Sequence, residues 1–175
     1  EYKQQLTDLF TKNRYRDIGP CLSSRVILGE NTKVVNEYGK TEESQESESL
    51  TPESYINANW VLPKRNYIAA QGPKQNTVVD FYKMLYQYKP ECIVMVTDWL
   101  ENGKPKCFNY LQNKGVVFPE DFPEITIKEN LGEIGSIKSV SGSLNISSIT
   151  IGELVIPHFH CLYIPDHLSL IHISE

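Results

Sequence analysis

The sequence predicts an α/β (α+β) domain in which a highly twisted mixed β-sheet is flanked by helices. Apolar residues recur at positions i, i+3, i+4 and i+7 from Val78 to Leu85, which is typical of an amphipathic helix packed on a core. The continuous apolar run Cys92–Val96 follows and indicates a strand buried on both faces. Short alternating segments after that run indicate further strands.

Composition limits the class of protein. A chain of 175 residues with 40% hydrophobic and 22% charged residues fits one globular domain. Its 17 basic residues against 22 acidic ones give a net charge of -5, so no global field attracts nucleic acid or an anionic membrane. Because the sequence has no membrane-spanning apolar stretch and no signal-peptide pattern, a location in the cytoplasm, or on the cytoplasmic side of a receptor-type parent, is expected. The four cysteines lack a C-x-x-C pair, which favours free thiols.

The first part of the chain divides into short elements. A helix is expected over Tyr2–Phe10 and a strand over Val26–Leu28. Residues 30–53 are rich in Ser, Thr and Glu, and such a composition buries too little apolar area to fold, so they are expected to form a mobile acidic loop inserted in the domain. Strand-like sequence resumes over Tyr55–Val61 and Tyr67–Ala70.

The last part of the chain has an all-β pattern. Glu124–Lys128 alternates, and Ser136–Val140 is expected to pair with Ser143–Ser147 across the turn Ser141-Gly142. One more strand is expected over Ile149–His160.

Several short strings, colinear over nearly the whole chain, carry a family resemblance. They are Asn13-Arg14-Tyr15-Arg16-Asp17-Ile18, Ser24-Arg25-Val26, Ser54-Tyr55-Ile56-Asn57-Ala58-Asn59, Tyr67-Ile68-Ala69-Ala70-Gln71-Gly72-Pro73, Asn76-Thr77-Val78, Ile93-Val94-Met95-Val96-Thr97, Lys106-Cys107, and His158-Phe159-His160 before Pro165-Asp166-His167. Together they resemble the catalytic domain of the cysteine-dependent protein tyrosine phosphatases. The resemblance implies hydrolysis of phosphotyrosine on proteins through a cysteinyl-phosphate intermediate, without metal or cofactor.

The resemblance also assigns substrate-binding residues. Tyr15 matches an aromatic residue that stacks on the phenyl ring of the substrate, and Asp17 matches a carboxylate that accepts hydrogen bonds from substrate amides. Arg16, between them, is counted with the substrate-binding residues. Without the resemblance, Tyr15 would be interpreted as a half-buried turn aromatic.

Catalytic assignments follow in the same way. Asp166 resembles the general acid that protonates the tyrosyl oxygen as the P–O bond breaks, whereas the alternative is an ordinary turn Asp after Pro165. Glu101 and Lys106 resemble a supporting loop beside the catalytic centre, with a solvated charged hairpin as the alternative. Gln71-Gly72-Pro73 is expected to shape the turn into the next helix.

One part of the family pattern is missing. The nucleophile of the family lies in a His-Cys-x₅-Arg loop, but the sixth residue after Cys161 is His167, and no other cysteine fits. Residues 1–167 are therefore expected to be a C-terminally incomplete phosphatase domain, and residues 168–175 a divergent or non-native tail. The chain alone is expected to be inactive, with the apolar face around Val94 and Met95 partly uncovered.

Two other interpretations stay open. A pseudophosphatase or phosphotyrosine-binding module is favoured by Ile164, which replaces the family's Trp before Pro-Asp, but a pure binder has no need of Asp166. A metal-dependent site is suggested by the H-x-H spacing of His158 and His160. The preferred alternative is that one of these histidines packs and the other forms a hydrogen bond.

Overall fold

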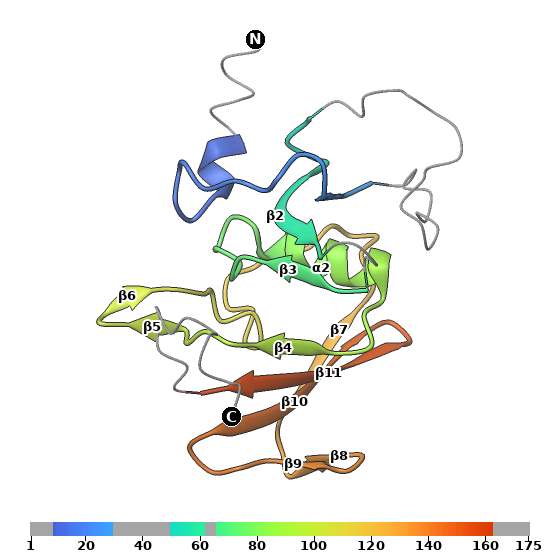
Figure 1. The fold of residues 1–175 in the computed structure, drawn as a ribbon. Coiled ribbons are helices and arrows are strands. Elements are labelled where there is room, and N and C mark those ends of the chain that lie inside the picture. Colours follow the sequence, from blue (N-terminus) through green and yellow to red (C-terminus); the bar gives the residue numbers. More distant parts are fainter. Residues whose placement is uncertain (1–8, 30–49, 62–65, 163–175) are drawn as a thin grey trace. The chain divides into compact units, whose positions relative to one another are not determined.

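The computed structural model describes residues 9–29, 50–61 and 66–162. These residues belong to two compact units, Glu1–Gln87 and Tyr88–Glu175 (Figure 1). Most of the expected acidic loop, Asp166 and the tail 168–175 lie outside the described residues, and so does most of the expected first helix. The single domain expected over residues 1–167 stays a prediction.

The first unit contains a three-stranded antiparallel sheet. Its strands are β1 (Arg25–Ile27), β2 (Tyr55–Trp60) and β3 (Ile68–Ala70), in the order β1-β2-β3. All three expected strands are confirmed, each with ends within one residue of the prediction. Residues 9–12 are helical, which agrees with the last part of the expected first helix.

Helix α2 (Val78–Tyr88) follows the sheet of the first unit along the chain. The expected apolar stripe is confirmed, because Val78, Phe81, Tyr82, Met84 and Leu85 are all buried. The helix ends where Lys89 adopts a positive φ of 46° before Pro90, a residue that cannot continue helical hydrogen bonding.

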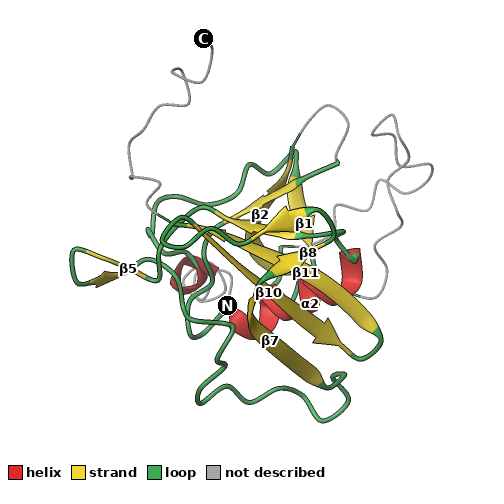
Figure 2. Cartoon of the chain, turned by 90° about the horizontal axis from the view of Figure 1, so that it is seen from below, coloured by secondary structure: helices red, strands yellow, loops and turns green. Residues whose placement is uncertain are grey.

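The second unit contains a mixed four-stranded sheet, which confirms the expected fold class. Its strands lie in the order β4 (Ile93–Met95), β11 (Leu154–Cys161), β10 (Leu144–Ile151) and β7 (Ile125–Leu131). Strand β4 is parallel to β11, and the other pairs are antiparallel. Figure 2 shows β10 and β11 side by side as long strands. Their isoleucines Ile146, Ile149, Ile151 and Ile156 are fully buried and form much of the core.

One expected strand and one expected pairing in this unit are wrong. The strand expected over Ile149–His160 is two strands, because Gly152, with a φ of 59°, allows a tight hairpin turn that joins β10 to β11. Segment 136–140 pairs mainly with the residues that precede it in the chain. Strand β9 (Ile137–Lys138) pairs with β8 (Glu133–Ile134) across a turn at Gly135. Only an isolated bridge between Val140 and Leu144 remains of the expected hairpin.

The expectation that strand Cys92–Val96 is buried on both faces is also wrong. Met95 is buried, but the side chains of Val94 and Val96 are 58% and 54% exposed. Strand β4 pairs only with β11 among the described strands, so it is an edge strand of its sheet. Of the apolar face around Val94 and Met95 that is expected to be partly uncovered, Val94 is exposed whereas Met95 is buried.

The four cysteines are free, as expected. Cys21 and Cys92 are exposed, whereas Cys107 is buried. Within residues 9–29, 50–61 and 66–162, no helix has the length and apolar character needed to cross a membrane.

Candidate functional site

The first part of the candidate site is the Tyr15 turn, residues 15–18 in the first unit. The Ile18 amide donates to the Tyr15 carbonyl at 3.0 Å, and the Tyr15 side chain is 51% exposed. Arg16 and Asp17 are exposed in the same turn. The structure thus brings the three expected substrate-binding residues together on the surface, while their roles stay predictions.

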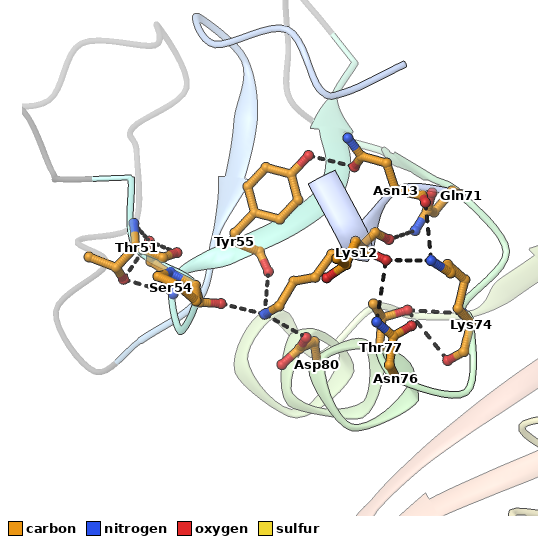
Figure 3. A network of polar contacts seen from close by, with 12 residues as sticks. Lys12, Asn13, Thr51, Ser54, Tyr55, Gln71, Lys74, Asn76, Thr77 and Asp80 are labelled. Carbon is orange, nitrogen blue, oxygen red and sulfur yellow. Dashed lines mark hydrogen bonds and ion pairs between the residues drawn. The ribbon is translucent and has the colours of Figure 1, made fainter. Parts of the chain in front are cut away.

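The backbone before Tyr15 is bound by side chains that follow β3. The Gln71 amide donates to the Lys12 carbonyl at 2.8 Å, and its oxygen accepts from the Arg14 amide at 2.9 Å. The Lys74 ammonium donates to the carbonyls of Thr11 and Asn13 (Figure 3). Burial, and after it the nearby Arg14 charge, lower the pKa of Lys74. The carbonyls of three consecutive residues therefore have side-chain donors.

The Lys12 side chain connects this segment to two other elements. Its ammonium forms an ion pair with Asp80 of α2 at 3.0 Å, and both side chains are more than four-fifths buried. It also donates to the Pro52 carbonyl and, at 3.5 Å, to the carbonyl of Tyr55 at the start of β2 (Figure 3). A partly buried ion pair with further hydrogen bonds restricts motion more than an exposed pair does.

An amide cluster, in which Asn13 is buried and Asn57 half-buried, holds the same segment from the side of β2. The Asn13 side-chain oxygen accepts from the Tyr55 hydroxyl at 2.6 Å and from the Asn57 amide at 3.0 Å. The Asn57 amide also donates to the Ile18 carbonyl at 2.8 Å. Burial raises the pKa of Tyr55, so its hydroxyl stays a donor at neutral pH.

Sequence reasoning missed the residues that hold the Tyr15 turn. Gln71-Gly72-Pro73 was expected only to shape a turn, but the Gly72 and Pro73 carbonyls each accept from the Arg14 guanidinium at 3.0 Å. The available signal was that these residues belong to the strings that carry the resemblance. Their pairing across nearly sixty residues could not be deduced from spacing.

The second part of the candidate site is the hairpin β5 (Leu100–Glu101) and β6 (Lys104–Pro105). Asn102 and Gly103 at its tip both have positive φ, which is typical of a two-residue hairpin turn. The Lys106 ammonium lies 2.8 Å from the Glu101 carboxylate, and these side chains are 19% and 34% exposed. The two expected supporting residues therefore form one ion pair, and their role in catalysis stays a prediction.

Four rings pack together behind this hairpin in the second unit. Trp99 contacts Tyr110 and His160, with centroid distances of 5.2 and 5.3 Å, and Tyr110 contacts His158 at 5.5 Å. The Tyr110 hydroxyl lies 2.7 Å from His158 Nε2, and His160 Nε2 lies 3.0 Å from the Thr97 carbonyl. Both histidines therefore pack and form hydrogen bonds.

The preferred interpretation of the H-x-H motif assigned packing to one histidine and a hydrogen bond to the other, whereas each of them has both. Across the described part of the chain, no group of three or more His, Cys, Asp or Glu side chains could hold a metal ion. The metal-free expectation itself stays a prediction. Asp166, the expected general acid, lies outside the described residues.

Comparisons with known proteins agree with the resemblance. A family model described as "Protein-tyrosine phosphatase" matches residues 10–167. The human receptor-type tyrosine-protein phosphatase eta is 29% identical over 95% of the chain, and the human tyrosine-protein phosphatase non-receptor type 12 is 40% identical over 57% of it. The chain spans only 11% of the length of each of these two relatives.

A solved structure gives the same result. It is described as the structural basis of the PTPN18 fingerprint on distinct HER2 tyrosine phosphorylation sites, and it matches with a TM-score of 0.58 and 25% identity. The match covers 90% of this chain and 50% of the solved one.

Proposed function

Because the chain belongs to the protein-tyrosine phosphatase family, we propose that the whole protein hydrolyses phosphotyrosine on other proteins. In this proposal the 175-residue chain supplies two parts of the site: the Tyr15 ring, which recognises the substrate, and the general acid Asp166. The nucleophilic cysteine comes from residues outside the printed sequence, since no Cys here is followed at the right distance by Arg.

The observation that carries the proposal is the Tyr15 turn. An aromatic side chain that is 51% exposed would ordinarily move freely, but the backbone just before it is bound by Gln71 and Lys74. An exposed ring on a restrained backbone suits stacking against a flat substrate ring. A deep slot bounded by such a ring selects phosphotyrosine, because the shorter phosphoserine would not carry its phosphate to the floor.

The proposed reaction has two steps. A cysteine thiolate attacks phosphorus and forms an S–P bond, the P–O bond to the tyrosyl oxygen breaks, and Asp166 gives its proton to that oxygen. Water then attacks the cysteinyl phosphate, with Asp166 accepting a proton, and releases phosphate and the thiolate. Protonation of the leaving group is worth about 10² to 10⁴ in rate.

The test begins with the native transcript read through and past the Asp166 codon, followed by expression of the longer protein. We expect phosphate release from a phosphotyrosine peptide, and Asp166→Asn should lower kcat by about 10² to 10⁴. Asp121→Asn is a matched control, since Asp121 is an exposed loop carboxylate. Equal loss in both variants, or no loss in Asp166→Asn, would remove Asp166 from the mechanism.

The printed chain by itself is proposed to be inactive. Phosphate release from a phosphotyrosine peptide by the purified 175-residue protein, abolished by Asp166→Asn, would contradict this. The cytoplasmic location expected from the sequence and the phosphotyrosine-protein partners belong to the same proposal.

A pseudophosphatase or phosphotyrosine-binding module is the second candidate. Ile164, which stands where the family has Trp, is the observation that favours it. If the longer protein lacks the Cys or the Arg of the phosphate loop yet binds phosphotyrosine peptides, this candidate replaces the first.

A further inference from the structure

We propose that Gln71 and Asn57 are positioning residues, which fix the backbone on both sides of Tyr15 and so set the direction of its ring before any ligand arrives. The proposal rests on the proposed function only in taking Tyr15 as the ring that meets phosphotyrosine. Neither residue is proposed to contact the substrate.

The Tyr15 turn lies at the surface of the first unit. Tyr15 and Ile18 are 51% and 59% exposed, so the turn is not anchored by burial in a core. Within the turn, a backbone hydrogen bond joins the Ile18 amide to the Tyr15 carbonyl. A turn of this kind samples many conformations unless its ends are restrained from outside.

Gln71 restrains the end before Tyr15. Its side-chain amide donates to the Lys12 carbonyl and accepts from the Arg14 amide, and so bridges two residues as a neighbouring β-strand would. Because the donor and the acceptor belong to one rigid amide group, both bonds form only in one backbone conformation.

Asn57 restrains both ends at once. Its NH₂ group donates to the Ile18 carbonyl at 2.8 Å and to the Asn13 side chain at 3.0 Å. It also lies 3.3 Å from the Gln71 oxygen, so the two amides form one cluster. The cluster therefore closes a loop from Asn13 to Ile18, with Tyr15 inside it.

The chain offers a matched control. Gln87 on α2 makes the same kind of bridge elsewhere: its amide donates to the Ile27 carbonyl at 3.0 Å and its oxygen accepts from the Gly29 amide at 3.1 Å. Gln71→Glu and Gln87→Glu each replace one amide donor facing a carbonyl by a carboxylate oxygen. Only the first change touches the Tyr15 turn.

The experiment measures hydrogen exchange of backbone amides in the full 175-residue chain by ¹⁵N NMR. In the unmodified chain the bonded Arg14 amide should exchange much more slowly than the neighbouring Arg16 amide. Gln71→Met removes the oxygen that accepts from the Arg14 amide and should speed Arg14 exchange by about 5-fold or more, whereas Gln87→Met should leave it unchanged. Equally fast exchange of Arg14 and Arg16 in the unmodified chain would overturn the proposal without any variant.

A second readout follows the ring itself. With 3-fluorotyrosine in the chain, the ¹⁹F line missing from Tyr15→Phe identifies Tyr15. In Gln71→Glu and Asn57→Asp this line should move toward the position of free 3-fluorotyrosine, and in Gln87→Glu it should stay. If Gln71→Glu and Asn57→Asp both keep the native Tyr15 line, the two amides do not position the ring.

A peptide titration separates this proposal from the proposed function. A phosphotyrosine peptide, compared with its unphosphorylated form, should shift the Tyr15 line in the longer protein expressed for the test of function, which is proposed to include the phosphate loop. If the peptide has no effect while Gln71→Glu still releases the ring, positioning is supported and the recognition role of Tyr15 fails. If the peptide shifts the line equally in Gln71→Glu and the ring stays ordered, recognition stands and positioning fails.

Discussion

His158 is a fully buried histidine whose surroundings favour the neutral imidazole. Its Nε2 pairs with the Tyr110 hydroxyl, while its buried Nδ1 has no hydrogen-bond partner among the described residues. The Tyr110 hydroxyl also lies 3.5 Å from the Met95 sulfur, and whether it donates to His158 Nε2 or accepts from it depends on the tautomer of the ring. When both ring nitrogens are protonated, the proton on Nδ1 is buried without an acceptor and close to His160.

Acid should therefore destabilise the fold through His158. Burial and the neighbouring His160 lower the pKa of His158 from 6.5 to about 4. The unfolded chain binds this proton at higher pH than the folded chain does. The contribution of the neutral His158 ring to the free energy of unfolding is thus complete above pH 6.5. It is lost as the pH falls toward 4, by about 3 kcal/mol in total. Urea unfolding at a series of pH values measures this loss of stability. In His158→Gln the slope of the unfolding free energy against pH should be smaller by the equivalent of about one proton. An unchanged slope would contradict this assignment.

The β10–β11 hairpin connects two strands that make up half of the mixed sheet, and it depends on one glycine. Gly152 has a φ of 59°, and a side-chain carbon built on it would lie 3.3 Å from the Cβ of Pro123. Gly142, with a φ of 73°, has nothing within 4 Å of the corresponding position. Substitution at Gly142 therefore meets backbone strain alone, whereas substitution at Gly152 meets backbone strain and a steric contact.

We expect Gly152→Ala to lower the free energy of unfolding more than Gly142→Ala does. Both substitutions meet the cost of a left-handed backbone, about 1 to 2 kcal/mol, and only Gly152→Ala also forces Pro123 to move. Denaturant midpoints of the two variants give the comparison. A larger effect at Gly142 would show that the contact with Pro123 relaxes freely.

At the scale of the whole molecule, the edge strand β4 leaves apolar surface in contact with water. Val94 and Val96 are more than half exposed, and Val94 is the register partner of Phe159 on β11. Contiguous exposed apolar residues bind hydrophobic dyes and favour association, whereas scattered ones do not.

We therefore expect the 175-residue chain to bind an environment-sensitive hydrophobic dye. The double variant Val94→Thr with Val96→Thr should lower the dye fluorescence, because it removes methyl groups from one patch. Val117→Thr is the control: Val117 is 87% exposed and should matter little as a single residue. The patch is not the dye site if the control and the double variant behave alike.

The sequence by itself determined the elements whose signal is local. The four residues of the predicted α2 stripe are all buried, with Met84 in addition, and β1, β2 and β3 begin and end within one residue of prediction. The Asn-Gly pair at positions 102 and 103 and the charges around it are sequence features, and the structure brings Glu101 and Lys106 together there. The colinear motifs were enough to identify the family.

Only the tertiary structure decided which distant residues meet. No periodicity indicates that Gln71 bonds to Lys12 and Arg14, or that Lys12 pairs with Asp80, because side-chain amides and ammonium groups find partners through space and not along the chain. The exposure of Val94 was also undecidable from its apolar run, since burial depends on the neighbours of a strand in its sheet. Local chemistry thus determined the elements, and long-range contacts determined the site.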